Sequence, residues 1–331
     1  MIPEAKNAAV SRALREAFGV GEFEEIRMLT EGMSSALVFR IAVRGRPYLL
    51  RIITKTDALN DPTRQFACMR AAAEAGLAPR IWYASTEDRI SITDFVPVRP
   101  LAAGKSGVAE LGSTVRRVHA LPPFPKLVNY LESMDGYVRK FQAAKILPEN
   151  ETDEVCRFYE RVSSVYPRHD ADLVSSHNDM KPENILFDGE RVWLVDWEAA
   201  FLNDRYLDLA VVANFFVRNE AEEEVFLRAY FGQRVDEYRR ARFYLMRQVV
   251  HMGYAAVFLL IGSSGKPIAP GGPPPGFRGF HDQILAGNRN LVSAEAKIDY
   301  ARIHMQQALV EMRAKQFEEA LRVVSGHPAR A

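Results

Sequence analysis

The stretch from Ser176 to Ala200, S-H-N-D-M-K-P-E-N-I-L-F-D-G-E-R-V-W-L-V-D-W-E-A-A, constrains the fold of this chain more than any other. It begins with the pattern H-x-D-x-x-x-x-N and continues with two short apolar runs on either side of Asp188-Gly189. An Asp-Gly pair between apolar runs is a strong signal for a tight β-hairpin. Because a hairpin brings its two ends together, the stretch predicts that Asn184 and Asp196 converge on one point.

Three side chains in this stretch suggest two chemical roles, metal binding and proton acceptance. The side-chain oxygens of Asn184 and Asp196 suit Mg²⁺, which takes one or two protein ligands together with phosphate oxygens. Asp179 lies on the loop before the hairpin and can accept a proton from a substrate hydroxyl. This arrangement is typical of a phosphotransferase. The alternative is a surface hairpin with scattered carboxylates, but a complete motif in its expected context favours the functional interpretation.

The bulk properties of the chain favour a cytoplasmic protein with two lobes. Its 331 residues exceed the usual size of a single hydrophobic core. A formal net charge of +1 gives no reason to expect nucleic acid or an anionic membrane as a partner. Cys68 and Cys156 are too isolated for a disulfide framework or a zinc site, which favours a reducing compartment. Residues 255–261 form the longest apolar stretch, too short to span a bilayer, and the N-terminus lacks a signal-peptide core.

In the first third of the chain, apolar residues at helical spacing predict a short amphipathic helix over residues 4–18 that ends at Gly19, and strands follow it. Strand-like runs up to residue 97 predict a five-stranded antiparallel sheet. The turn between the first two runs contains Gly32, Ser34 and Ser35. A turn of small residues can lay backbone N–H groups over the phosphates of a nucleotide, although the same turn can also be a plain hairpin.

The sequence predicts mainly helices for the rest of the chain. We therefore expect a nucleotide-binding lobe over residues 1–97 and a catalytic, acceptor-binding lobe over residues 98–331. A last long helix is expected at about 281–325. Before it, the Pro- and Gly-rich residues 262–279 exclude a regular element and form either a surface insert or a lid over the acceptor.

The stretch around Asp179 resembles the catalytic loop and metal-binding hairpin of the protein-kinase-like superfamily. Its D-W-E ending and residues 204–216 are more similar to the choline/ethanolamine kinase and aminoglycoside phosphotransferase branch than to protein kinases. The resemblance covers residues 25 to about 325 and implies an α+β fold with two lobes. It also implies ATP- and Mg²⁺-dependent transfer of phosphate to the hydroxyl of a small molecule, an amino alcohol such as choline or ethanolamine.

The resemblance assigns roles to further residues. His177 braces the catalytic loop, and Lys181 neutralises the transferring phosphoryl group; protein kinases have this lysine and choline kinases usually do not. Arg51 stands where protein kinases carry a strand lysine and choline kinases also have arginine, so its guanidinium can hold phosphates. Gln65 stands in place of the glutamate that supports this cation, and Glu74 is an alternative support.

The resemblance implies two further parts of the nucleotide-binding site. The turn before the second strand is similar to the G-G-M-S-N loop of choline kinases, with Glu31 at the first glycine and Ser35 at the asparagine. Where strand passes into a Pro-containing loop, the backbones of Asp94 and Val96 are expected to pair with adenine.

The acceptor site departs from the family pattern. Two tryptophans of the choline-kinase cage correspond here to His251 and Tyr254, and a tyrosine corresponds to Ala199. Tyr254 and Phe258 can form a smaller aromatic cage, with Glu198 supplying charge. Alternatively, His251, Tyr254 and Phe258 are the core-facing side of a helix, since they are spaced i, i+3 and i+7.

Other functions compete with the amino-alcohol kinase. An aminoglycoside or other antibiotic kinase keeps the chemistry but changes the acceptor. A protein kinase is disfavoured by D-W-E in place of D-F-G and by the short sequence available for an activation segment. A non-catalytic nucleotide-binding protein finds support only in Gln65 and Glu31. The sequence leaves open the oligomeric state and the choice between ATP and GTP.

Overall fold

The computed structural model describes residues 2–29, 36–57, 60–102, 104–168, 172–269 and 274–327. The chain folds into two compact units. The first unit comprises Met1–Lys126 and Val174–Leu202, and the second comprises Leu127–Leu173 and Asn203–Ala331. Residues 98–126 and 174–202 therefore group with the N-terminal sheet, whereas our predicted boundary lies at residue 97, which stays a prediction.

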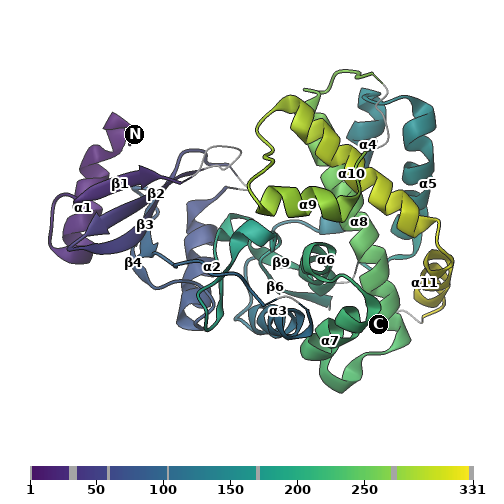
Figure 1. Cartoon of the computed structure of the whole chain (residues 1–331), viewed down its shortest axis with the longest axis horizontal. Coiled ribbons are helices and arrows are strands. Elements are labelled where there is room, and N and C mark those ends of the chain that lie inside the picture. Colours follow the sequence, from purple (N-terminus) through teal and green to yellow (C-terminus); the bar gives the residue numbers. More distant parts are fainter. Residues whose placement is uncertain are drawn as a thin grey trace. The chain divides into compact units, whose positions relative to one another are not determined.

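The first unit is built on the expected five-stranded antiparallel sheet, with strand order β1-β2-β3-β5-β4 (Figure 1). Its strands are β1 (Glu25–Met28), β2 (Ala36–Val43), β3 (Arg46–Ile53), β4 (Ile81–Ser85) and β5 (Ile90–Asp94). The turn from β2 to β3 is formed by Arg44 and Gly45, both at positive φ. A two-residue turn with this backbone matches the twist of the strands it joins, so it fixes the register of β3, which carries Arg51.

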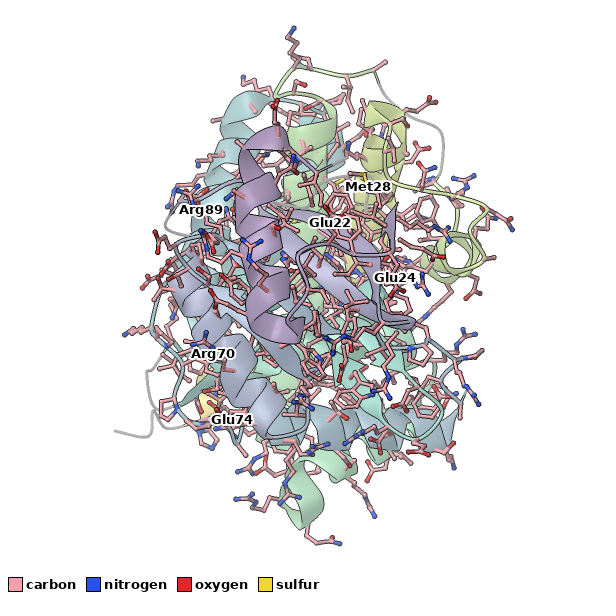
Figure 2. All side chains as sticks on the ribbon, turned by 90° about the vertical axis from the view of Figure 1, so that its left-hand side faces the viewer. Glu22, Glu24, Met28, Arg70, Glu74 and Arg89 are labelled. Carbon is pink, nitrogen blue, oxygen red and sulfur yellow. The ribbon has the colours of Figure 1, made fainter. Side chains whose placement is uncertain are left out.

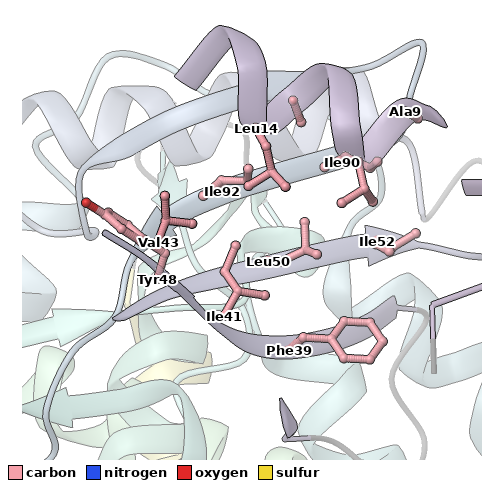
Figure 3. Close-up of a cluster of buried hydrophobic side chains, with 12 residues drawn as sticks. Ala9, Leu14, Phe39, Ile41, Val43, Tyr48, Leu50, Ile52, Ile90 and Ile92 are labelled. Carbon is pink, nitrogen blue, oxygen red and sulfur yellow. The ribbon is translucent and has the colours of Figure 1, made fainter. Parts of the chain in front are cut away.

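One face of this sheet is covered by α1 (Asn7–Phe18), which the apolar spacing predicted and which ends at Gly19 in the left-handed conformation. Figure 3 shows Leu14 and Ala9 of this helix above the aliphatic side chains of the strands. Leu50 and Ile52 of β3 are fully buried there. The neighbouring residue Arg51 points to the opposite face because side chains alternate along a strand.

Short helices and strands complete the first unit. They are η1 (Glu4–Lys6), α2 (Pro62–Glu74), α3 (Lys105–Val118), η3 (Pro182–Asn184), β7 (Ile185–Phe187), β8 (Val192–Leu194) and η4 (Trp197–Ala199). α2 begins at Asp61, whose carboxylate accepts hydrogen bonds from the backbone N–H groups of Thr63 and Arg64. Arg64 also donates to the carbonyl of Ala200 at 2.6 Å, so α2 is tied to the end of the D-W-E segment.

We expect Gly107→Ala to destabilise the first unit. Gly107 lies in α3, and a Cβ atom there would stand 2.0 Å from the carbonyl oxygen of Ala102, a backbone atom. Relieving this overlap costs about 1–3 kcal/mol, which exceeds the usual gain from placing alanine in a helix. Thermal unfolding should show a lower midpoint. Gly136→Ala in α4 (Tyr130–Ala144), where nothing lies within 4 Å of the added Cβ, is the matched control and should leave the midpoint unchanged or raise it slightly.

The second unit is mainly helical (Figure 1). Its helices are α4 (Tyr130–Ala144), α5 (Glu149–Val165), α6 (Arg205–Phe216), α7 (Glu220–Phe231), η5 (Gly232–Arg234), α8 (Glu237–Gly262), α9 (Phe277–Leu285), α10 (Ala294–Met312) and α11 (Lys315–Gly326). Where the chain passes between the units, β6 (Leu173–Ser176) pairs with β9 (Phe201–Asp204).

The prediction of one last helix at about 281–325 is wrong, because α9, α10 and α11 occupy this region. Gly287 follows α9 at positive φ, which ends a helix readily. Ser293 then starts α10 by accepting a hydrogen bond from the N–H of Ala296. Most of the Pro- and Gly-rich residues 262–279 lie between α8 and α9, but the expectation that they exclude a regular element is wrong at both ends, because α8 includes Gly262 and α9 begins at Phe277. Residues 270–273 fall outside the described part, so the choice between lid and insert stays open.

α8 forms the centre of the second unit and is long and apolar enough to cross a membrane by length and composition alone. However, 72% of its most apolar 18-residue window is buried inside the protein, as in the core helix of a soluble domain. Packing against α10, α11 and α6 therefore accounts for its hydropathy.

Candidate active site

His177 joins the catalytic loop to the hairpin behind it. The ring is fully buried and its Nε2 donates a hydrogen bond to the carbonyl of Val195 at 2.9 Å. The indole of Trp197 packs against the same ring, with centroids 4.7 Å apart. His177 therefore fixes the start of the loop to the residues on both sides of Asp196, which fits the bracing role expected of it.

Asp179 is held by two side chains of its own loop. Nζ of Lys181 lies 2.8 Å from Oδ2 of Asp179. Nδ2 of Asn184 donates to the same oxygen at 2.9 Å and to the backbone carbonyl of Asp179 at 2.8 Å. Since both contacts are made to Oδ2, the other carboxylate oxygen is the one suited to take a proton from a substrate.

Lys181 carries a positive charge at this position. Burial of its amine pushes the pKa down, but the negative charges of Asp179 and Asp196 outweigh burial, so the pKa of Lys181 lies above its ordinary value. A lysine that stays protonated beside Asp179 can neutralise charge on a transferring phosphoryl group.

The hairpin converges at its base as the sequence predicts. β7 and β8 pair in register, and the N–H of Val195 donates to the carbonyl of Asn184 at 3.1 Å. At the other end, Asp188 accepts hydrogen bonds from the indole N–H of Trp193 and from two backbone N–H groups of the turn. These bonds, that of Trp193 above all, hold the pKa of Asp188 at about 2. The turn thus fixes the hairpin that carries the predicted metal ligands.

The donors at the base of the hairpin fit Mg²⁺. The amide nitrogen of Asn184 is used by Asp179, so its amide oxygen is directed away and is available to a metal. Oδ1 of Asp196 is buried and, apart from its ion pair with Arg51, has no hydrogen-bond partner among the described residues. Within the described chain no cluster of three or more His, Cys, Asp or Glu forms a complete protein cage. Two hard oxygen ligands beside a phosphate are what Mg²⁺ takes in kinases.

Two residues of the site adopt the left-handed backbone conformation, which is uncommon for residues other than glycine. Asn178 has φ 65° and Asp196 has φ 66°. The amide of Asn178 donates to the carbonyl of Ala199 at 2.8 Å, which ties the catalytic loop to the D-W-E segment. Such strain persists where the surroundings impose it, and it clusters at functional sites. The sequence analysis missed Asn178, although asparagine before Asp179 is a residue that tolerates this conformation.

Arg51 has two carboxylate partners from the D-W-E segment. Its Nη2 lies 2.6 Å from Oε2 of Glu198 and 2.8 Å from Oδ1 of Asp196. In the structure, Glu198 thus pairs with Arg51; its expected role of supplying charge to the acceptor stays a prediction. The pair also explains how Arg51 is supported without a glutamate in α2.

Neither α2 residue considered as the support of Arg51 supplies a charge to it. Gln65 is buried, and its Nε2 has no hydrogen-bond partner among the described residues. Glu74 is exposed, and Figure 2 labels it on the same outer stretch of α2 as Arg70. The carboxylate comes instead from Glu198, far along the chain. The nucleotide-binding role of Gln65 stays a prediction.

The expected adenine contacts lie at the end of β5. The N–H of Asp94 donates to the carbonyl of Arg80 at 2.9 Å, and its carboxylate accepts from the indole of Trp82 at 2.7 Å. The carbonyl of Asp94 is therefore the group suited to adenine, followed by the backbone of the buried Val96. Three residues predicted to cradle phosphate, Gly32, Ser34 and Ser35, lie outside the described residues.

The predicted acceptor residues lie on α8, in the second unit. His251 is 2% exposed, and its Nδ1 lies 2.9 Å from Nδ1 of His304. Burial lowers the pKa of His251 well below its ordinary value, so the ring is neutral. Tyr254 stacks on His304 with centroids 4.6 Å apart and is partly exposed, whereas Phe258 is buried. The burial of His251 and Phe258 fits the alternative of a core-facing side, and their binding of an acceptor stays a prediction.

Comparison with solved structures shows which known proteins share this fold. A choline/ethanolamine kinase family protein from Mesorhizobium loti superposes with a TM-score of 0.68 and 21% identity, covering 97% of this chain and 99% of that one. The choline kinase LicA from Streptococcus pneumoniae gives a TM-score of 0.61 at 15% identity, covering 92% and 97%. A spectinomycin phosphotransferase in complex with ADP and spectinomycin gives 0.57 at 13% identity, covering 96% and 97%.

Sequence similarity adds a shorter match and a family assignment. Protein LicA from Haemophilus influenzae is 31% identical over 75 residues, which are 23% of this chain and 26% of that protein, so the match spans about a quarter of LicA. The model of the phosphotransferase enzyme family matches residues 25–244, which include every residue of the catalytic loop and hairpin. The resemblance, the fold class and the prediction of an enzyme that transfers phosphate are thereby confirmed, and this chain belongs to the phosphotransferase enzyme family.

Proposed function

We propose that this protein transfers the γ-phosphate of ATP, with Mg²⁺, to the hydroxyl group of a small amino alcohol such as choline or ethanolamine. The proposal rests on one observation: Lys181 and Asn184 both contact the same carboxylate oxygen of Asp179 and so fix its orientation. Its second oxygen is positioned to bind and deprotonate a hydroxyl. The hairpin that holds Asn184 and Asp196 begins on the same loop.

The roles of the residues follow from their chemistry. Asp179 orients the acceptor hydroxyl and takes its proton, and the charge of Lys181 stabilises the negative charge on the transferring phosphoryl group. Asn184 and Asp196 would hold Mg²⁺, which would neutralise negative charge on the phosphates. Arg51 contacts phosphate through its guanidinium and is oriented for it by Glu198.

The choice of an amino alcohol rests on the relatives and on the chemistry of α8. Two of the similar structures are described as choline kinase or choline/ethanolamine kinase family proteins, and the sequence match is to LicA. Tyr254 is partly exposed and lies beside Phe258, so the exposed part of its ring is where an ammonium group would contact it. The similarity to spectinomycin phosphotransferase supports an aminoglycoside or other antibiotic as the second candidate acceptor.

We propose a cytoplasmic location as well. Cys68 and Cys156 are both buried and free, as is usual for proteins of a reducing compartment. ATP, the proposed donor, is supplied there.

The proposal is tested by measuring ADP release from Mg-ATP with choline, ethanolamine, thiamine, methylthioribose, homoserine and several aminoglycosides. We expect turnover with one amino alcohol and formation of its phosphate ester, detected by mass spectrometry. Asp179→Ala run in parallel corrects for contaminating kinases and ATP hydrolysis. Turnover with an aminoglycoside alone would replace the amino alcohol by the second candidate. ATP binding without turnover across the panel would contradict the acceptor assignment.

A further inference from the structure

A buried guanidinium on α8 binds residues on either side of Val174–Leu202, the catalytic segment that carries the loop and the hairpin. Arg242 is 2% exposed. Its Nη1 donates to Oδ2 of Asp172 at 2.5 Å, and its Nη2 donates to Oδ2 of Asp204 at 2.7 Å. All three residues belong to the second unit.

Asp172 and Asp204 have special positions along the chain. Asp172 directly precedes β6, and Asp204 is the last residue of β9. The chain leaves the second unit after Leu173 and returns to it at Asn203. Every proposed catalytic and metal-binding residue of the loop and hairpin lies between these two points. The single side chain of Arg242 therefore binds one residue just before the catalytic segment and one residue just after it.

The surroundings of Arg242 restrict its movement. Three tyrosine rings stand with their centroids 4.6–5.8 Å from its guanidinium carbon: Tyr166, Tyr206 and Tyr238. Asp204 also accepts a hydrogen bond from the N–H of Tyr206 and so caps α6. Burial raises the pKa of Asp204, and the charge of Arg242 acts against this rise. Removing the guanidinium would leave the Asp204 carboxylate, which is only 14% exposed, without its cation, which is unfavourable. The Asp172 carboxylate is 33% exposed and would be hydrated more readily.

We propose that Arg242 is a positioning residue for phosphoryl transfer, which clamps the two ends of the catalytic segment through Asp172 and Asp204. Phosphoryl transfer depends on placing the reacting groups to within about 1 Å, so a clamp at the ends of the segment acts on Asp179 and Asp196 without touching substrate. The kinetic consequence rests on the proposed function; the clamp itself is measurable without an acceptor.

Arg242→Met and Arg242→Lys test the clamp. We expect kcat to fall by about tenfold or more in Arg242→Met, because a small misplacement of a catalytic group costs up to about 100-fold. The KM for the acceptor and the Kd for nucleotide should change by less than about twofold, since the buried Arg242 side chain is not accessible to either ligand. Lysine keeps the charge but presents a single ammonium group in place of the forked guanidinium, so Arg242→Lys should lose less. Hydrogen exchange should accelerate in residues 174–202 and stay unchanged in the five-stranded sheet.

Arg247→Met is the matched control on the same helix. Arg247 donates to Glu223 and to Asn214, each at 2.9 Å, and so joins α7 and α6 within the second unit. Its loss should lower the unfolding temperature without lowering kcat or accelerating exchange in residues 174–202. An equal loss of kcat in Arg247→Met, or unchanged kcat and exchange in both Arg242 variants, would overturn the proposal.

Asp204→Asn keeps the test decisive if Arg242→Met does not fold. Asparagine still caps α6, but it removes the charge that Arg242 binds. The same selective acceleration of exchange in residues 174–202 is expected, and an unchanged exchange pattern would overturn the clamp. If no acceptor in the panel is phosphorylated, the exchange measurement alone decides, so a wrong acceptor and a wrong clamp give different results.

Discussion

Asp179→Ala is expected to lose about 10²–10⁴-fold in kcat, the usual contribution of a positioned general base, while nucleotide still binds. The methyl group of alanine cannot orient or deprotonate a hydroxyl. It also leaves Lys181 and Asn184 without the carboxylate oxygen that both now contact. Asp179→Asn keeps the shape and an acceptor oxygen for these two partners, so it separates the loss of the base from the disruption of the loop.

Steady-state kinetics and a nucleotide thermal shift measure both parts of this prediction. Equal losses of kcat in Asp179→Ala and Asp179→Asn would assign the effect to the base, whereas a much smaller loss in Asp179→Asn would assign it to loop geometry. Glu190→Gln in the exposed turn of the same hairpin removes one carboxylate without touching the loop, so its kcat should stay at the wild-type value. Wild-type turnover in Asp179→Ala would exclude Asp179 as the base.

Local signals in the sequence were sufficient for the core of the site. The pattern from His177 to Asp196 predicted a loop, a hairpin and the convergence of its ends, because each depends on residues close in sequence. The five-stranded sheet followed in the same way from the strand-like runs up to residue 97. Such elements are specified by turn residues and apolar spacing alone.

The contacts that sequence reasoning missed join residues far apart in the chain. Arg51 is separated from Glu198 by 147 positions, and the expectation of a partner in α2 followed the family pattern instead of the charge two residues after Asp196. Arg242 lies 70 positions from Asp172. No local pattern marks such pairs, because an ion pair formed by tertiary packing joins charged residues that lie far apart in the sequence.

Asp196→Asn is expected to remove the dependence of nucleotide binding on Mg²⁺ and to lower kcat by about 10²–10³-fold. A metal contributes several kcal/mol to the stabilisation of phosphoryl transfer, and each 1.4 kcal/mol corresponds to about tenfold in rate. Asparagine tolerates the left-handed backbone found at this position, so the hairpin should keep its conformation. The substitution therefore removes charge from the metal site with little added strain.

Thermal unfolding with ATP, in the presence of Mg²⁺ or of EDTA, isolates this effect. A ligand stabilises the folded state in proportion to the logarithm of its concentration over Kd, so the wild type should gain an increment with Mg²⁺ that EDTA abolishes. Asp196→Asn should show the smaller, EDTA-like shift under both conditions. Because Asp196 also pairs with Arg51, Glu198→Gln is the matched comparison: it removes the other carboxylate beside Arg51 but should keep the Mg²⁺ increment. A full increment in Asp196→Asn would show that the metal is held elsewhere, and its loss in both variants would mean that the pairing of Arg51, rather than a metal contact of Asp196, determines the increment.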